Sequence, residues 1–187
     1  MEQARRKCAH LERILLVVGE PNAGKSRLLR QMFSDARLGA LVPPNGPFKP
    51  RALSRERGIA GRFTSPHEAQ ETPADYHQKI EDALAKAWRV DFWRMNYFSA
   101  VQPNPRHHMY DIVRTCKDLQ AAFIPERIRV VQLSPDQWGS AASQLTSTQV
   151  DGLRALDVEV LTLDARRSAH PAEPGNIRIL ADYFDFS

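Results

Sequence analysis

Residues 14–26 read Ile-Leu-Leu-Val-Val-Gly-Glu-Pro-Asn-Ala-Gly-Lys-Ser, and this stretch decides the fold. Its first five residues form a continuous apolar run, which is typical of a strand buried on both faces of a parallel sheet. Gly19 ends the run, and Gly24 directly precedes Lys25. From Lys25 to Phe33 the apolar residues recur at helical spacing. The sequence therefore predicts a buried strand, a glycine-rich loop and a helix in direct succession.

The rest of the chain alternates short apolar runs with longer amphipathic stretches. We expect further strands over residues 58–64, 93–101, 127–133 and 158–163. We expect further helices over residues 75–89, 109–123 and 148–156, and a loop over the proline-rich residues 39–50. Strands that alternate with helices in this way predict helices on both faces of a parallel sheet. The expected fold class is an α/β three-layer sandwich with a mainly parallel, five-stranded sheet.

The composition is that of a globular chain. The 187 residues are 42% apolar and 26% charged, which fits a single domain over 1–187 and excludes collagen, coiled coil and wholesale disorder. The longest apolar run, 14–18, is too short to cross a bilayer, so we expect a cytoplasmic protein with no membrane partner. Two cysteines do not make a disulfide framework. The net charge of +4 favours anionic partners, namely nucleotides, nucleic acid or an acidic protein surface.

The loop carries the clearest chemical signal. Residues 19–26 match the spacing G-x-x-x-x-G-K-[ST], in which backbone N–H groups wrap around phosphates at the start of a helix. The chain therefore resembles the P-loop NTPase superfamily over residues 14–33. The resemblance implies binding of ATP or GTP with Mg²⁺, with Lys25 on the β- and γ-phosphates and the Ser26 hydroxyl on the metal. It places the nucleotide on Gly19, Pro21, Asn22, Ala23, Gly24, Lys25, Ser26 and Arg27.

The sequence also bears on the choice of base. The Asp-x-x-Gly, [Asn/Thr]-Lys-x-Asp and Ser-Ala-Lys signatures of P-loop GTPases do not occur in the required places. ATP is therefore favoured over GTP.

A second acid is needed to hold Mg²⁺ or to position the attacking nucleophile. The third expected strand ends at Gln102 and brings no acid. Asp164 follows the last strand, which in most layouts lies away from the loop. Glu68 and Asp136 each occur in a Ser-Pro-x-acid context after a strand. We therefore take Lys25, Glu68 and Asp136 as the candidate catalytic residues, and Ser26 with Glu68 as the candidate metal ligands.

Three functions stay open at this point. The first is a small Mg²⁺-dependent NTPase that hydrolyses ATP as a switch or as a subunit of a larger assembly. The second is a phosphotransferase acting on a nucleotide, a nucleoside or a polynucleotide end, whose acceptor contacts the basic run at Lys49, Arg51, Arg55, Arg57 and Arg62. The third is a silent nucleotide-binding interaction protein, which the missing acid on the third strand motivates. The aromatic tail within residues 168–187 packs on its own domain or inserts into a partner, such as a second copy.

Overall fold

The structure, a computed structural model, describes residues 8–141, 144–167 and 172–185. The strands are β1 (His10–Val18), β2 (Arg51–Ala52), β3 (Arg57–Arg62), β4 (Arg94–Val101), β5 (Arg127–Leu133) and β6 (Glu159–Leu163). The α-helices are α1 (Lys25–Gln31), α2 (Pro73–Trp88), α3 (Ile112–Phe123), α4 (Ser147–Ala155) and α5 (Ala172–Asp182). Two short 3₁₀ helices, Met32–Ser34 and Ala36–Leu38, follow α1.

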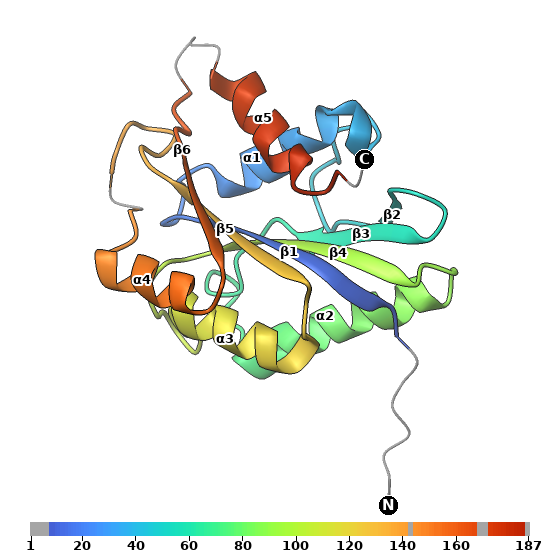
Figure 1. Cartoon of the computed structure of the whole chain (residues 1–187). Coiled ribbons are helices and arrows are strands. Elements are labelled where there is room, and N and C mark those ends of the chain that lie inside the picture. Colours follow the sequence, from blue (N-terminus) through green and yellow to red (C-terminus); the bar gives the residue numbers. More distant parts are fainter. Residues whose placement is uncertain (1–7, 142–143, 168–171, 186–187) are drawn as a thin grey trace, which may run out of the picture.

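The strands form one twisted sheet in the order β2-β3-β4-β1-β5-β6. All neighbouring pairs are parallel except β2 with β3. Helices α1 and α5 cover one face of the sheet, and α2, α3 and α4 cover the other (Figure 1). The prediction of a three-layer α/β fold with a mainly parallel sheet is therefore confirmed.

Strand β1 lies at the centre of the sheet, between β4 and β5. Alternate residues of a strand face opposite sides, so Ile14 and Leu16 join the core under α2 and α3 while Leu15 and Val17 join the core under α1 and α5. All four side chains are completely buried. A strand covered on both faces needs apolar residues at every position, which explains the unbroken run.

Most expected elements appear close to their predicted ends. Thr72 caps α2 in a reciprocal pair of hydrogen bonds with Asp75, as its place before Pro73 suggests. The helix expected from residue 109 begins instead at Ile112, because the Asp111 side chain accepts a hydrogen bond from the Arg114 N–H and caps the helix there.

The prediction of five strands is wrong by one strand. Two residues, Arg51 and Ala52, pair antiparallel with Ile59 and Gly58 at the edge of the sheet. A two-residue strand that directly follows a proline-rich stretch has no periodicity of its own, so the sequence pattern could not reveal it.

The C-terminal region also differs from expectation. Residues before Ile177 read as polar, proline-rich tail, yet α5 begins at Ala172. Pro174 and Gly175 look like helix breakers, but proline is tolerated in the first turn, where its missing N–H would have no partner. Residues 168–171 and 186–187 of the expected tail lie outside the described residues.

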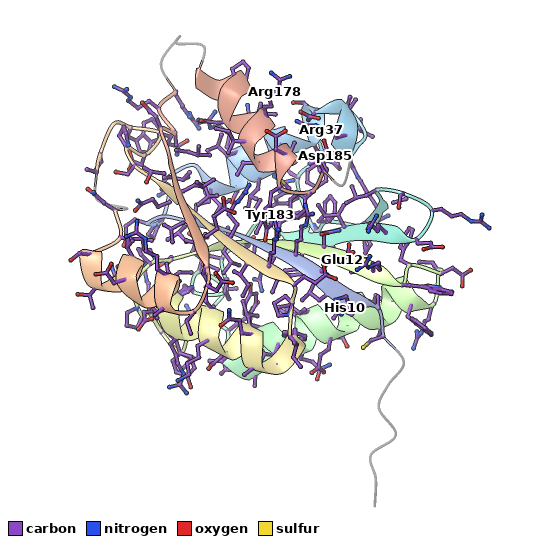
Figure 2. All side chains as sticks on the ribbon, in the orientation of Figure 1. His10, Glu12, Arg37, Arg178, Tyr183 and Asp185 are labelled. Atoms are coloured by element: carbon purple, nitrogen blue, oxygen red, sulfur yellow. The ribbon has the colours of Figure 1, made fainter. Side chains whose placement is uncertain are left out.

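The end of the chain packs on the body of the protein. Tyr183 and Phe184 are 3% exposed and belong to the core beneath α1 and α5. Arg13 donates hydrogen bonds to the carbonyls of Tyr183 and Asp185, and the Arg129 guanidinium lies 4.3 Å from the centre of the Tyr183 ring. Figure 2 shows Arg37 beside Asp185, with which it forms an ion pair. Residues 183–185 of the tail therefore pack on their own chain.

Phe184→Ala is expected to lower the free energy of unfolding by about 3 kcal/mol, because loss of a buried ring leaves a cavity. Ile179→Ala is the matched control on α5, where the side chain is 37% exposed, and should cost only about 0.5 kcal/mol. Urea denaturation measures both. Equal, small losses would contradict the packing of this segment against the core.

Candidate functional site

The glycine-rich loop, residues 19–26, connects the buried end of β1 to the start of α1. Asn22 and Gly24 adopt positive φ angles of 63° and 101°. At Gly24 a side chain would be strained, and its Cβ would lie 3.2 Å from the Cβ of Gln137. The loop therefore needs glycine at this position both for its turn and for close packing against residue 137.

The Lys25 amine lies inside the loop. Its Nζ donates hydrogen bonds of 2.8 Å to the carbonyls of Gly19 and Glu20, and it lies 3.5 Å from Oε1 of Glu68. The side chain is 3% exposed. Burial lowers the pKa of Lys25 below its ordinary value, and the Glu68 and Glu20 carboxylates offset part of this effect.

The next residue, Ser26, connects the loop to the end of β3. Its hydroxyl donates a 2.6 Å hydrogen bond to the carbonyl of Phe63. A hydroxyl that donates its proton still has two oxygen lone pairs, so this contact leaves the Ser26 oxygen able to accept or ligate. The neighbouring Arg27 donates to the Ala165 carbonyl at 3.0 Å, which ties α1 to the segment after β6.

A cavity of about 190 Å³ opens over the loop. Its lining comprises Asn22, Ala23, Gly24, Lys25, Ser26, Arg27, Glu68, Gln137 and Arg167. Six of the eight residues predicted to bind nucleotide therefore line this space, among them the candidate metal ligand Ser26. The second candidate metal ligand, Glu68, lines it too. The other two, Gly19 and Pro21, shape the loop but are not part of the lining.

Gln137 and Arg167 were not predicted from the sequence. The Gln137 amide donates to the Asn22 carbonyl, and its backbone N–H donates to the Ala23 carbonyl at 3.1 Å. The side-chain carbonyl of Gln137 accepts from Nε of Arg167 at 3.0 Å. Their positions after the fourth and fifth predicted strands, at the ligand edge of the sheet, were the only sequence signal that pointed to them.

The structure does not bring the Asp136 carboxylate to the cavity. Its Oδ1 accepts hydrogen bonds from the backbone N–H groups of Trp138, at 2.8 Å, and Ser140, at 2.9 Å. Asp136 thus shapes the turn that places Gln137 on the loop. Asp164 follows the edge strand β6 and pairs with Arg166.

Strand β4 runs directly beside β1, and the Gly19 N–H donates to the Val101 carbonyl at 3.3 Å. The residue that leaves this strand next to the loop is Gln102, which is 2% exposed. Its Nε2 has no hydrogen-bond partner among the described residues. The position nearest the loop on the adjacent strand therefore carries a neutral amide and no acid.

His67 is buried and directly precedes Glu68, which lines the loop cavity. Its Nε2 lies 2.9 Å from the Tyr110 carbonyl, and its Nδ1 lies 3.3 Å from the Ser65 hydroxyl. These partners assign the proton to Nε2, because a carbonyl can only accept. Burial lowers the pKa of His67 below its ordinary value, and the positive charge of Lys25 adds to the shift, whereas the Tyr110 carbonyl opposes it.

The basic run between α1 and β3 does not act as a unit. Arg57 pairs with the buried Glu12, and Arg62 pairs with Glu71. Arg51 donates to the Leu41 carbonyl and lies over the rings of Phe33 and Phe48. These arginines hold the loop and the sheet edge together. Arg62 lines a cavity that is separate from the one over the loop.

A comparison of the chain with protein-family models finds no match, and a comparison with curated proteins finds none either.

Within the described part of the chain, no helix is long and apolar enough to cross a membrane. Three or more His, Cys, Asp or Glu side chains do not gather anywhere in those residues into a group that could hold a metal ion.

Stability should fall as the pH is lowered below about 6.5, because His67 takes up a proton in the unfolded chain before it does so in the folded one. The contribution is fully present above the unfolded pKa and is lost as the pH falls. His67→Gln should make the fall shallower by at most about 1.4 kcal/mol per pH unit. Urea denaturation of both proteins from about pH 8 to about pH 5 measures the slopes. Identical slopes would contradict a neutral buried His67.

Proposed function

We propose that the chain is a small P-loop NTPase that binds and hydrolyses a nucleoside triphosphate with Mg²⁺. The observation that carries the proposal is the cavity over the glycine-rich loop, in which the Lys25 amine lies 3.5 Å from the Glu68 carboxylate. A buried amine, loop backbone and a carboxylate from the segment after β3 are the groups that phosphate and its counter-ion require. The position of these groups at the end of the central parallel strand also supports the proposal that the fold is of P-loop type.

Lys25 would exchange its partners when a triphosphate binds. Its amine now bonds to the two loop carbonyls of Gly19 and Glu20. Phosphate oxygens carry more negative charge than carbonyl oxygens, so they would compete well for the same three N–H donors. Burial lowers the pKa of Lys25. A phosphate beside the amine would raise this pKa again, because an adjacent negative charge favours the charged form. The lysine would then hold the negative charge that develops on the transferred phosphoryl group.

The residues present fit a Mg²⁺ ion in part. Ser26 presents an oxygen with free lone pairs, and Glu68 presents a half-buried carboxylate beside Lys25. Mg²⁺ commonly takes only one or two protein oxygens and completes its shell with phosphate and water. When bound, the ion neutralises negative charge between the β- and γ-phosphates. In this site Ser26 and Glu68 would hold it.

Glu68 is the better of the two acids proposed for positioning water. It lines the loop cavity, whereas the Asp136 carboxylate is occupied by two backbone N–H groups of its own turn. ATP is favoured because the residues that read guanine in related GTPases are absent from the sequence. Slow hydrolysis that a partner stimulates would fit a switch or a subunit of a larger assembly.

A second candidate is a nucleotide-binding protein without catalysis. The observation that favours it is Gln102, a buried amide at the end of the strand that pairs with β1. An amide can orient a water molecule, but it cannot accept a proton at neutral pH or balance the charge of a metal ion. If Glu68 serves only as the partner of Lys25, the chain would bind ATP and leave it intact.

Lys25→Ala should weaken binding of Mg²⁺–ATP at least about tenfold, because charge-assisted hydrogen bonds to phosphate contribute about 1.5–3 kcal/mol. Calorimetry with ATP and with GTP measures affinity and names the base. Lys117→Ala removes an exposed lysine on α3 that does not line the loop cavity, so it should leave binding unchanged. Thermal denaturation checks that both variants fold. Failure of the native chain to bind either nucleotide would overturn the proposed function.

Glu68→Gln separates the two candidates. If Glu68 positions water, released phosphate should fall about a hundredfold, much more than the affinity for ATP falls, because general-base groups contribute about 10²–10⁴ in rate. Asp164→Asn is the matched control at a strand end outside the cavity. Phosphate release that Glu68→Gln leaves unchanged would contradict the catalytic role of Glu68. Tight binding by the native chain without any release would select the silent protein.

A further inference from the structure

A second and larger cavity, of about 580 Å³, lies beside strand β3 and shares no lining residue with the loop cavity. It has three walls. One is the chain segment 46–50, one is the end of β3 with residues 63–64, and one is the exposed side of α2. Figure 1 shows β3 next to the end of the sheet, with α2 running beneath it. The volume falls within the range of pockets that hold small molecules.

The cavity exists because β2 is so short. Its pairing with β3 covers only Gly58 and Ile59, so the following half of β3 has no partner on that side among the described strands. Continued antiparallel pairing would bring residue 50 opposite residue 60, but Pro50 has no N–H to donate. Pro47 adds a second break. The segment 46–50 therefore lies away from the strand edge, and the gap between them is the cavity.

Aromatic side chains form the inner part of the cavity. Phe48 and Phe63 line it with their ring centres 5.8 Å apart, nearly perpendicular to one another. Tyr97 also lines it, although this residue is only 3% exposed, and its hydroxyl makes no hydrogen bond with a described residue. Burial raises the pKa of Tyr97 well above its ordinary value, so the hydroxyl keeps its proton and can donate it.

The rim of the cavity is positively charged. Four cationic side chains line it, namely Arg30, Arg62, Lys79 and Lys86. One acidic side chain, Asp82, is among the lining residues. Glu71 pairs with both Arg62 and Lys79 from just outside the lining. Four cations against two carboxylates leave two positive charges.

Two of these cations are placed to meet a ligand. The Arg30 guanidinium lies 3.9 Å from the centre of the Phe63 ring and donates one hydrogen bond to the Pro44 carbonyl, which leaves its other N–H groups for a ligand. The Lys86 side chain lines the cavity and has no ion pair or hydrogen bond with a described residue. A cation held over an aromatic ring, with a second cation on the α2 wall, suits a ligand that is flat at one end and anionic at the other. Two uncompensated positive charges match a phosphate monoester, which carries close to two negative charges at neutral pH.

We propose that this cavity binds a small aromatic phosphate monoester, with the ring against Phe48 and Phe63 and the phosphate near Arg30 and Lys86. The inference goes beyond the proposed function and does not depend on it, because the two cavities share no residue. They do meet at Phe63, whose ring lines this cavity while its carbonyl accepts the Ser26 hydroxyl of the loop. A compound bound here would therefore lie next to whatever the loop holds.

The test titrates phenyl phosphate and adenosine 5′-monophosphate into the native chain and follows binding by NMR and calorimetry. Lys86→Glu should weaken binding of both compounds at least about tenfold, since it replaces a phosphate-binding cation with a repelling charge. Phe48→Ala should weaken phenyl phosphate more than inorganic phosphate. Lys117→Glu, an equal charge change on α3, is the matched control. Lys86 and Lys117 are both exposed, so neither substitution should disturb folding.

Lys25→Ala separates this proposal from the proposed function. Binding of the two probes that persists in Lys25→Ala but is lost in Lys86→Glu supports the second cavity, even if the native chain fails to bind ATP. Binding that is lost in Lys25→Ala and unaffected by Lys86→Glu places the probes on the loop and overturns the proposal, while nucleotide binding stands. Inorganic phosphate that binds as tightly as phenyl phosphate, or no binding of either probe at millimolar concentration, also overturns it.

Discussion

A strand buried on both faces must satisfy its backbone through its neighbours, and β1 does so by pairing with β4 on one side and β5 on the other. The rest of the molecule follows from that constraint. Because all three strands are parallel, their carboxyl ends reach the same edge of the sheet. The glycine-rich loop, Gln102 and the turn that carries Gln137 therefore have to share one place, although they are far apart in the chain.

Charged and polar groups gathered at such an edge must be paired, because an unpaired buried charge is costly. Lys25 meets this requirement with two loop carbonyls and Glu68. His67 meets it by staying neutral between a hydroxyl and a carbonyl. Gln102 alone keeps a buried amide hydrogen-bond donor without a described partner at this edge. Two of the three partners of the Lys25 amine are neutral carbonyls, so a phosphate could replace them. This is the physical basis of the proposed nucleotide site.

The two cavities have different origins. The one over the loop is made of backbone that glycine allows to turn closely, with polar side chains delivered by three different strand ends. The one beside β3 exists because prolines stop the edge strand β2 from pairing further with β3. Its lining combines aromatic and cationic side chains. Phe63 and Ser26 connect them through a single hydrogen bond. The two cavities thus share no lining residue, and each is lined by cationic side chains that suit the anionic ligands proposed for them.

The sequence by itself determined the elements whose physics is local. An unbroken apolar run, the spacing of Gly19, Gly24 and Lys25, and the Thr72 cap all act within a few residues, so β1, its loop and α2 could be predicted. Only the tertiary structure decided which acid meets the lysine, since Glu68 and Asp136 share a local context but only Glu68 reaches the cavity. The short strand β2 and the roles of Gln137 and Arg167 likewise depend on partners distant in the chain. Local patterns determine conformation, whereas distances between segments are determined by how the sheet and its helices pack.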